Sequence, residues 1–256
     1  MVAGRLAGLG AFLLLASCQS SPRPPEALEP EVVYFELGLD LPGYGMLDFF
    51  VSRPPGFDAE APVRVLINFP VAGQMRANAR ALINSPITYQ ATRRGYVVIV
   101  PYAPPRALRG RTLDALPGFL DRLQAEFNVK DRKFDVIGAS AGGITALELA
   151  RRDPDSLRTV IAYPGYLSEP EPDFLQDMRG LCPQIYVGSR DVRFRRRLKR
   201  DLQVFEEAGV PVHAEIIPGA GHDFGSFEPE RARWLLDRLE APPPCKEENT
   251  FVGDER

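Results

Sequence analysis

The sequence predicts an α/β fold with a mostly parallel, eight-stranded sheet and helices on both faces. Short runs rich in β-branched residues alternate with segments of helical periodicity over most of the chain. Several of these runs are continuously apolar, such as residues 97–100, which is typical of strands buried on both sides. The chain has 256 residues and 45% hydrophobic residues, so we expect one folded domain with a sizeable core.

The expected strands follow one another at residues 32–39, 46–52, 63–69, 96–102, 133–138, 158–163, 184–188 and 212–218. Helical segments are expected after the third strand and after each later one, at residues 76–93, 113–127, 141–152, 173–179, 193–208 and 229–239. No helix separates the first two strands, so we expect an antiparallel meander at one edge. The sixth strand ends at Tyr163 and the seventh begins at Gln184, which leaves no room for a large lid domain.

The N-terminus has the layout of a secretory signal peptide over residues 1–18. Arg5 precedes an apolar run that reaches Leu15, and small residues come just before Cys18. The four residues Leu15-Ala16-Ser17-Cys18 resemble the lipobox of bacterial lipoproteins, in which the cysteine is acylated. The resemblance implies lipidation at Cys18 and an extracytoplasmic protein anchored in the cell envelope, at the outer membrane or in the periplasm of a cell with two membranes. The alternative is an ordinary cleaved signal with an incidental cysteine.

The remaining chain divides into a tether, a folded domain and a tail. Residues 19–31 are rich in Pro, Ser and Glu and poor in apolar side chains, so they are expected to form a flexible tether. The folded domain is expected over residues 32–240, followed by a flexible tail at 241–256. An exported compartment permits a disulfide between Cys182 and Cys245, but their spacing does not decide whether it forms.

Charge argues against a nucleic-acid partner. The net charge of −3 and the pI near 5.6 lack the basic character that nucleic-acid binding requires. One basic run, residues 193–200, lies on a helical pattern and is interpreted as a solvated helix face. Two loops are candidates for lining a site: the proline-rich residues 101–111, which could equally be a surface connection, and the acidic, aromatic residues 164–175.

The motif Gly138-Ala139-Ser140-Ala141-Gly142 carries the chemistry. It matches G-x-S-x-G, and it lies between a predicted strand and a predicted helix, which is the context of a nucleophile elbow. The pattern predicts Ser140 as a nucleophile on a sharp turn, with the backbone N–H of Ala141 at the helix start facing a developing oxyanion.

A serine nucleophile needs a base, and an acid must orient that base. The chain holds two histidines. His213 lies inside a predicted strand, where a structural role is expected, whereas His222 lies in a glycine-rich loop after the last strand and is the candidate base. The candidate acid is Asp191, just past the end of the penultimate strand, although a simple helix cap is the alternative role there. The other aspartates considered do not directly follow a strand end before His222; they are Asp173, Asp177 and Asp223.

The chain order Ser140, Asp191, His222 is that of α/β-hydrolases, and residues 32–240 resemble that superfamily. The run from Phe127 to Gly143 resembles the elbow region of polyhydroxyalkanoate depolymerases, feruloyl esterases and prolyl oligopeptidase catalytic domains. The resemblance implies hydrolysis of an ester or amide through an acyl-enzyme, without cofactor or metal. Many members carry His-Gly after the third strand for the second half of the oxyanion hole. Here the backbone N–H of Val71 or Ala72 is expected to serve instead.

These observations predict a lipid-anchored, extracytoplasmic serine hydrolase. A carboxylesterase acting on a small-molecule or polymeric ester is the first hypothesis. The alternatives are a peptidase or amidase of the same fold, and a catalytically idle hydrolase fold that serves as a binding protein. Loss of a triad residue would indicate the last of these, and all three residues are present.

Overall fold

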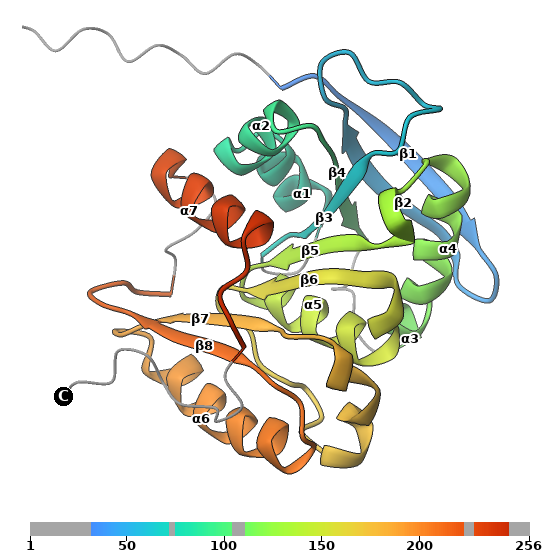
Figure 1. Ribbon diagram of the computed structural model, residues 1–256. Helices are drawn as coiled ribbons and strands as arrows, with labels where there is room; N and C mark the ends of the chain where they lie inside the picture. Colours follow the sequence, from blue (N-terminus) through green and yellow to red (C-terminus); the bar gives the residue numbers. More distant parts are fainter. Residues whose placement is uncertain (1–31, 72–74, 104–110, 223–227, 246–256) are drawn as a thin grey trace, which may run out of the picture. The chain divides into compact units, whose positions relative to one another are not determined.

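The computed structural model describes residues 32–71, 75–103, 111–222 and 228–245 (Figure 1). The predicted signal peptide with Cys18 and the predicted tether lie outside these residues, as do Ala72, Asp223 and most of the 101–111 loop. The predicted tail is described only as far as Cys245. None of the helices in the described ranges is long and apolar enough to cross a membrane.

Eight strands form one sheet, in the order β1-β2-β4-β3-β5-β6-β7-β8. The strands are β1 (Tyr34–Leu41), β2 (Gly45–Ser52), β3 (Arg64–Phe69), β4 (Tyr96–Tyr102), β5 (Phe134–Gly138), β6 (Leu157–Ala162), β7 (Gln184–Gly188) and β8 (His213–Ile217). β1 pairs with β2 and β2 with β4 in antiparallel fashion, and every other pairing is parallel. The predicted edge meander is therefore confirmed, as is the mostly parallel sheet.

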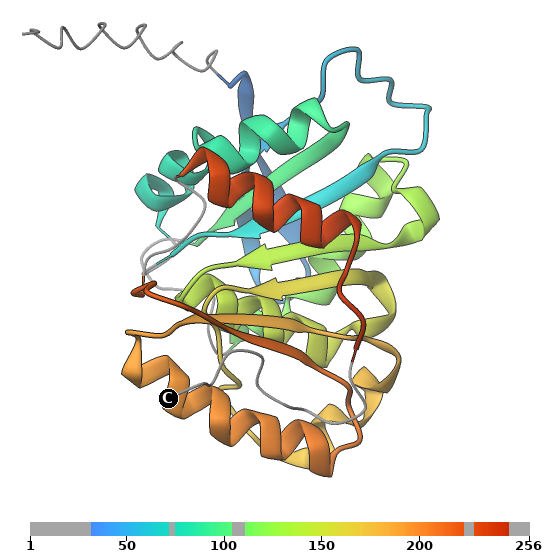
Figure 2. The same ribbon diagram turned by 60° about the vertical axis from the view of Figure 1, so that its left-hand side comes forward.

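Helices cover both faces of this sheet (Figures 1 and 2). One face packs against α1 (Arg76–Ile83), α2 (Pro86–Arg93) and α7 (Pro229–Glu240). The other packs against α3 (Arg111–Asp114), α4 (Leu116–Glu126), α5 (Ala141–Arg152) and α6 (Val192–Glu207). All seven residues of β4 are buried, as a strand covered on both faces requires.

Two predicted helices are each divided in two, and prolines mark the breaks. Pro86 has no N–H to continue a helix, and the preceding Ser85 adopts extended backbone, so α2 starts anew there. Pro117 lies in the first turn of α4, where its missing N–H is tolerated. The weak helix expected at residues 173–179 is a 3₁₀ helix, η4 (Pro172–Gly180).

The carboxyl ends of the central strands lie level with one another. Phe69 at the end of β3 is in register with Gly138 of β5, which in turn pairs with Ala162 of β6. At the other side, Gly188 of β7 pairs with Ile217 of β8. Loops that leave these ends therefore emerge at one edge of the sheet, where open α/β sheets bind their ligands.

Candidate active site

Ser140 lies on a strained turn between β5 and α5. Its backbone has φ 55° and ψ −114°, a left-handed conformation that is uncommon for a residue with a side chain. The turn is fixed by hydrogen bonds from Ser140 N to Pro164 O at 2.8 Å and from Gly142 N to Ala139 O at 2.8 Å. The strained backbone holds the hydroxyl at the tip of the turn, as a nucleophile elbow requires.

The glycines of the motif permit the close packing of this turn. A β-carbon added to Gly138 would lie 2.2 Å from the carbonyl oxygen of Gly142. One added to Gly142 would lie 2.1 Å from the carbonyl oxygen of Phe69, at the end of β3. Only glycine therefore fits at either position without a shift of the backbone.

The three predicted triad side chains lie in hydrogen-bond contact. His222 Nε2 is 2.9 Å from Ser140 Oγ, and His222 Nδ1 is 2.5 Å from Asp191 Oδ2. Because a carboxylate only accepts, Nδ1 donates to Asp191 and leaves the Nε2 lone pair to accept the serine proton. The Asp191 side chain is 7% exposed and that of His222 is 41% exposed, so the base faces solvent while its partner is buried.

Asp191 has a second contact, in which it caps the start of α6. This is the alternative role that the sequence predicts for it. Its Oδ1 accepts from Phe194 N at 3.2 Å, at the start of α6, while its Oδ2 contacts His222. The contacts that the two interpretations require are present together, because the two oxygens have different partners. The cap restricts the rotation of the carboxylate and so orients the imidazole.

Backbone hydrogen bonds connect the loop of Asp191 to the loop of His222. Ser189 N donates to Ile217 O at 3.0 Å, and Arg190 N donates to Ala220 O at 2.9 Å. The hydroxyl of Ser189 accepts from Gly219 N at 2.9 Å. The two loops therefore form one unit, and these hydrogen bonds set the distance between acid and base.

Two backbone N–H groups are candidates for binding an oxyanion. Ala141 is the first residue of α5, and none of the described residues accepts a hydrogen bond from its N–H outside the helix. Val71 follows β3, whose end packs against Gly142, and its carbonyl accepts from Asn78 Nδ2 at 3.2 Å. Ala72, the other predicted donor, lies outside the described residues.

The alternative base, His213, and the alternative acids Asp173 and Asp177 lie on other elements. His213 pairs with Gln184 at the amino end of β7, the end opposite Ser140, and contacts Glu215 at 3.8 Å. Asp173 and Asp177 belong to η4. In the predicted acidic rim, Glu169 lies 3.7 Å from Arg151. Among the described residues, no three histidine, cysteine or acidic side chains gather as a metal site would require.

Aromatic rings lie beside the base, and one of them, Tyr166, belongs to the loop 164–175 that the sequence indicated as a candidate for lining the site, whereas Phe194 was not predicted there. The ring of Phe194 lies 4.8 Å from that of His222, and the ring of Tyr166 lies 5.3 Å from that of Phe194. The sequence places Phe194 only within the helix expected at residues 193–208. Its position three residues after Asp191 was the available signal, because a residue one turn past a cap lies close to it.

The sequence of this chain was compared with protein families and with curated proteins. The model of the dienelactone hydrolase family matches residues 106–237, just over half of the chain. A search among curated proteins gives no match.

Solved structures share the fold at low sequence identity. The ferulic acid esterase of Anaeromyces mucronatus is 13% identical with a TM-score of 0.60, over 82% of this chain and 91% of its own. A dienelactone hydrolase-like promiscuous phosphotriesterase from metagenomic libraries is 16% identical with a TM-score of 0.59, over 81% and 98%.

Dipeptidyl peptidase 4 of Porphyromonas gingivalis is 16% identical with a TM-score of 0.62, over 81% of this chain. The match spans only 36% of that peptidase, so the likeness concerns one part of a longer protein. The neighbours identify an α/β-hydrolase fold, as the sequence resemblance implied. With its family match extending from residue 106 to residue 237 and including all three predicted triad positions, the chain belongs to the dienelactone hydrolase family.

Proposed function

We propose that this hydrolase is a serine carboxylesterase whose acyl-enzyme forms on Ser140. The observation that carries the proposal is the continuous contact from Asp191 through His222 to Ser140, with distances of 2.5 and 2.9 Å. The strained elbow and the start of α5 beside it support the same assignment. The esterases among the structural neighbours support an ester as the substrate.

The reaction follows from the positions of these groups. His222 Nε2 takes the hydroxyl proton as Ser140 Oγ bonds to the ester carbonyl carbon. The N–H groups of Ala141 and Val71 stabilise the resulting oxyanion. His222 then gives its proton to the leaving alcohol. A water molecule, deprotonated by His222, attacks the acyl carbon, and the acid is released while Ser140 regains its proton.

The triad is tested by combining substitutions. Ser140→Ala and His222→Ala should each lower kcat on a short-chain aryl ester by at least about 10⁴-fold, and the double variant should lose no more than either single variant. Asp191→Asn should lower kcat by up to about 10⁴-fold, because the imidazole is held in the wrong tautomer. His213→Ala is the control, since His213 lies at the other end of the sheet.

Two outcomes would contradict the assignment. One is wild-type turnover by Ser140→Ala, and the other is equal damage from His213→Ala and His222→Ala in folded proteins. A fluorophosphonate probe should label the wild type and not Ser140→Ala. Parallel assays with an aryl ester and with a dipeptide anilide separate esterase from peptidase activity, and turnover confined to the anilide would overturn the choice of an ester.

We further propose that the protein is anchored to a membrane of the cell envelope through a lipid on Cys18. The support is the lipobox-like run Leu15-Ala16-Ser17-Cys18 after a short apolar segment. One acyl chain binds a bilayer only marginally, so an anchor with several chains is the stable form. Cys18→Ala should release the protein from the membrane fraction or leave its signal uncleaved. A processed, membrane-bound Cys18→Ala protein would contradict the anchor.

A further inference from the structure

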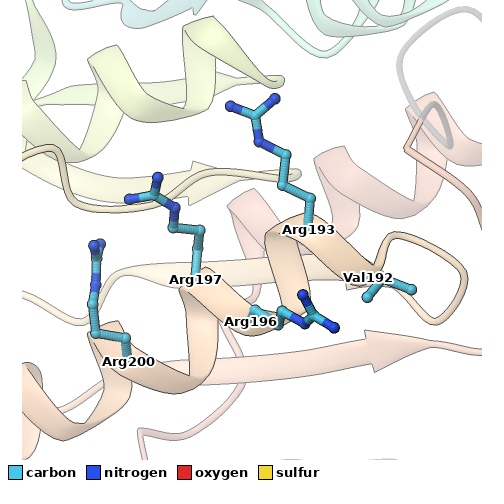
Figure 3. A pocket seen from close by; sticks show the side chains of 5 residues that line it. All are labelled: Val192, Arg193, Arg196, Arg197 and Arg200. Atoms are coloured by element: carbon cyan, nitrogen blue, oxygen red, sulfur yellow. The ribbon is translucent and has the colours of Figure 1, made fainter.

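Helix α6 carries a pocket lined almost entirely by arginines. Its volume is about 550 Å³, and its lining residues are Val192, Arg193, Arg196, Arg197 and Arg200. Figure 3 shows Arg193, Arg197 and Arg200 extending on the same side of the helix. At 1.5 Å per residue, Arg197 and Arg200 lie about 6 Å and about 10 Å along the axis from Arg193. Arg193, Arg197 and Arg200 thus form a row of positive charge along the helix, which we call the arginine row.

An ion pair within the protein accounts for only one arginine of this row, Arg200. Arg200 is held by Asp201, and its Nη2 donates to Leu167 O at 2.9 Å. For Arg193, Arg196 and Arg197, no carboxylate of the described residues lies within ion-pair distance. Like charges three and four residues apart destabilise a helix, so the mutual proximity of these arginines is not itself a source of stability.

The arginine row is continuous with the proposed catalytic centre. It begins two residues after Asp191, the acid that contacts His222. The guanidinium of Arg197 lies 4.9 Å from the centre of the Tyr166 ring. The rings of Tyr166, Phe194 and His222 then follow at 5.3 and 4.8 Å. A ligand bound along the row therefore reaches the base through one wall of aromatic rings.

We propose that the arginine row binds a polycarboxylate chain, and that the hydrolysed ester is one carried on such a chain. This inference rests on the proposed esterase function and names its substrate class. The planar guanidinium matches a carboxylate through two parallel hydrogen bonds. The steps of about 6 Å from Arg193 to Arg197 and about 4.5 Å from Arg197 to Arg200 suit a chain in which each unit carries its own carboxylate. A partly esterified polycarboxylate offers both groups that this surface requires: an ester for Ser140 and free carboxylates for the row.

Binding is tested without turnover, in the full chain with Ser140→Ala. Fluorescently labelled oligogalacturonate is the probe, and anisotropy gives its Kd at several salt concentrations. Adding Arg193→Gln or Arg197→Gln should each weaken binding about tenfold, as expected for the loss of a charge-assisted hydrogen bond. The affinity should fall as salt rises. Arg233→Gln is the matched control, because Arg233 is an exposed arginine on α7 and should leave the Kd unchanged.

Two further arms decide the chemistry of the ligand. Neutral dextran oligomers should not bind, and polyphosphate of matched charge should bind less tightly than oligogalacturonate. With the active wild type, oligogalacturonate should raise the KM of a small neutral ester and leave its kcat unchanged.

Equal binding of the probe by the Arg193→Gln/Arg197→Gln double variant and its parent would overturn the proposal. Tighter binding of polyphosphate would overturn the choice of carboxylate. The binding measurement uses the inactive Ser140→Ala variant and requires no turnover. It can therefore be interpreted even if the esterase assignment fails.

Discussion

At the scale of single residues, Gly142 sets how closely the elbow approaches strand β3. A β-carbon there would lie 2.1 Å from Phe69 O and 2.8 Å from Pro70 O, and both are backbone atoms that cannot rotate away. The oxyanion donors proposed here, Ala141 and Val71, lie on the two sides of this contact. Their separation therefore depends on the absence of a side chain at residue 142.

We predict that Gly142→Ala lowers both stability and turnover. Overpacking of this kind costs about 1–3 kcal/mol, and moving β3 away from α5 would misplace the donors. Gly118→Ala in α4 is the control, because a β-carbon there meets nothing within 4 Å. It should be neutral or stabilise by about 0.5–1 kcal/mol. Urea denaturation and kcat on an aryl ester are the measurements, and an unchanged midpoint and kcat for Gly142→Ala would contradict the prediction.

At the residue scale, the sequence predicted which residues lie together where the signal was local. The structure brings together Ser140, Asp191 and His222 because a flanked motif and two strand ends determine where those residues emerge. The sequence did not separate Val71 from Ala72 as donors, since any backbone N–H is chemically suitable. It also missed Phe194 beside His222, because that contact depends on how α6 rotates against a distant loop.

At the scale of elements, two buried carboxylates hold the loop after β6. Glu148 on α5 accepts from Ser168 N at 3.1 Å, and Asp201 on α6 accepts from Leu167 N at 2.7 Å. Arg151 and Arg152 neutralise Glu148, whose side chain is 1% exposed. Tyr166 belongs to the same loop, so these carboxylates position the aromatic wall beside His222.

The Glu148 contacts predict a pH-dependent stability. Burial raises the pKa of Glu148, but hydrogen bonds from Arg152 and Arg151 outweigh it and hold the pKa below its usual range. A carboxyl whose pKa is lower in the folded state stabilises the fold above its unfolded pKa of about 4.3. That contribution is lost as pH falls through the lower folded value.

Glu148→Gln should therefore cost about 3 kcal/mol at neutral pH, as expected when a buried pair loses one partner. The difference from wild type should shrink as pH falls below about 4, because the wild-type carboxyl then becomes protonated too. Denaturant unfolding across this range measures it. Glu171→Gln, at an exposed site, is the control and should track the wild type. A difference that is constant with pH would show that the charge of Glu148 has no part in it.

The sequence predicted whether each segment is a strand or a helix better than it predicted where the segment begins and ends. All eight strands follow from short runs rich in apolar residues, most of them with β-branched side chains, and Pro86 explains why a continuous helical pattern breaks into α1 and α2. Periodicity does not show which charges are buried, so the roles of Glu148 and Asp201 were not predicted. The basic run of α6 was interpreted as a solvated face, and Arg193 and Arg196 are exposed; the sequence did not show that four of its arginines line a pocket.

At the scale of the whole domain, the sequence predicted the sheet but not the order of its strands. The order places β4 between β2 and β3, so β3 lies next to β5 and the Phe69 end of one strand meets the Gly138 elbow of the other. Apolar patterning identifies a strand but not its neighbours. Neighbour choice comes from long-range packing and from crossover connections.

A disulfide closes the last part of the domain. It joins Cys182, just before β7, to Cys245, beyond α7, with a sequence separation of 63 residues. The enclosed segment contains β7, α6, β8 and α7, and thus both Asp191 and His222. The spacing alone had left this pairing open. A stable disulfide is expected in an exported protein, so the bond supports the proposed extracytoplasmic location.

We predict that this disulfide stabilises the domain mainly by restricting the unfolded chain. Closing a loop of this length contributes about 4 kcal/mol in the chain-entropy model, which corresponds to about 10 °C in Tm for a domain of this size. Thermal unfolding with and without reductant, with thiol titration to verify reduction, measures the effect. Cys182→Ala/Cys245→Ala should melt where the reduced wild type melts and should not respond to reductant. If the verified reduced protein kept the Tm of the oxidised one, the bond would not restrain unfolding, and the loops of Asp191 and His222 would be held by the hydrogen bonds between them.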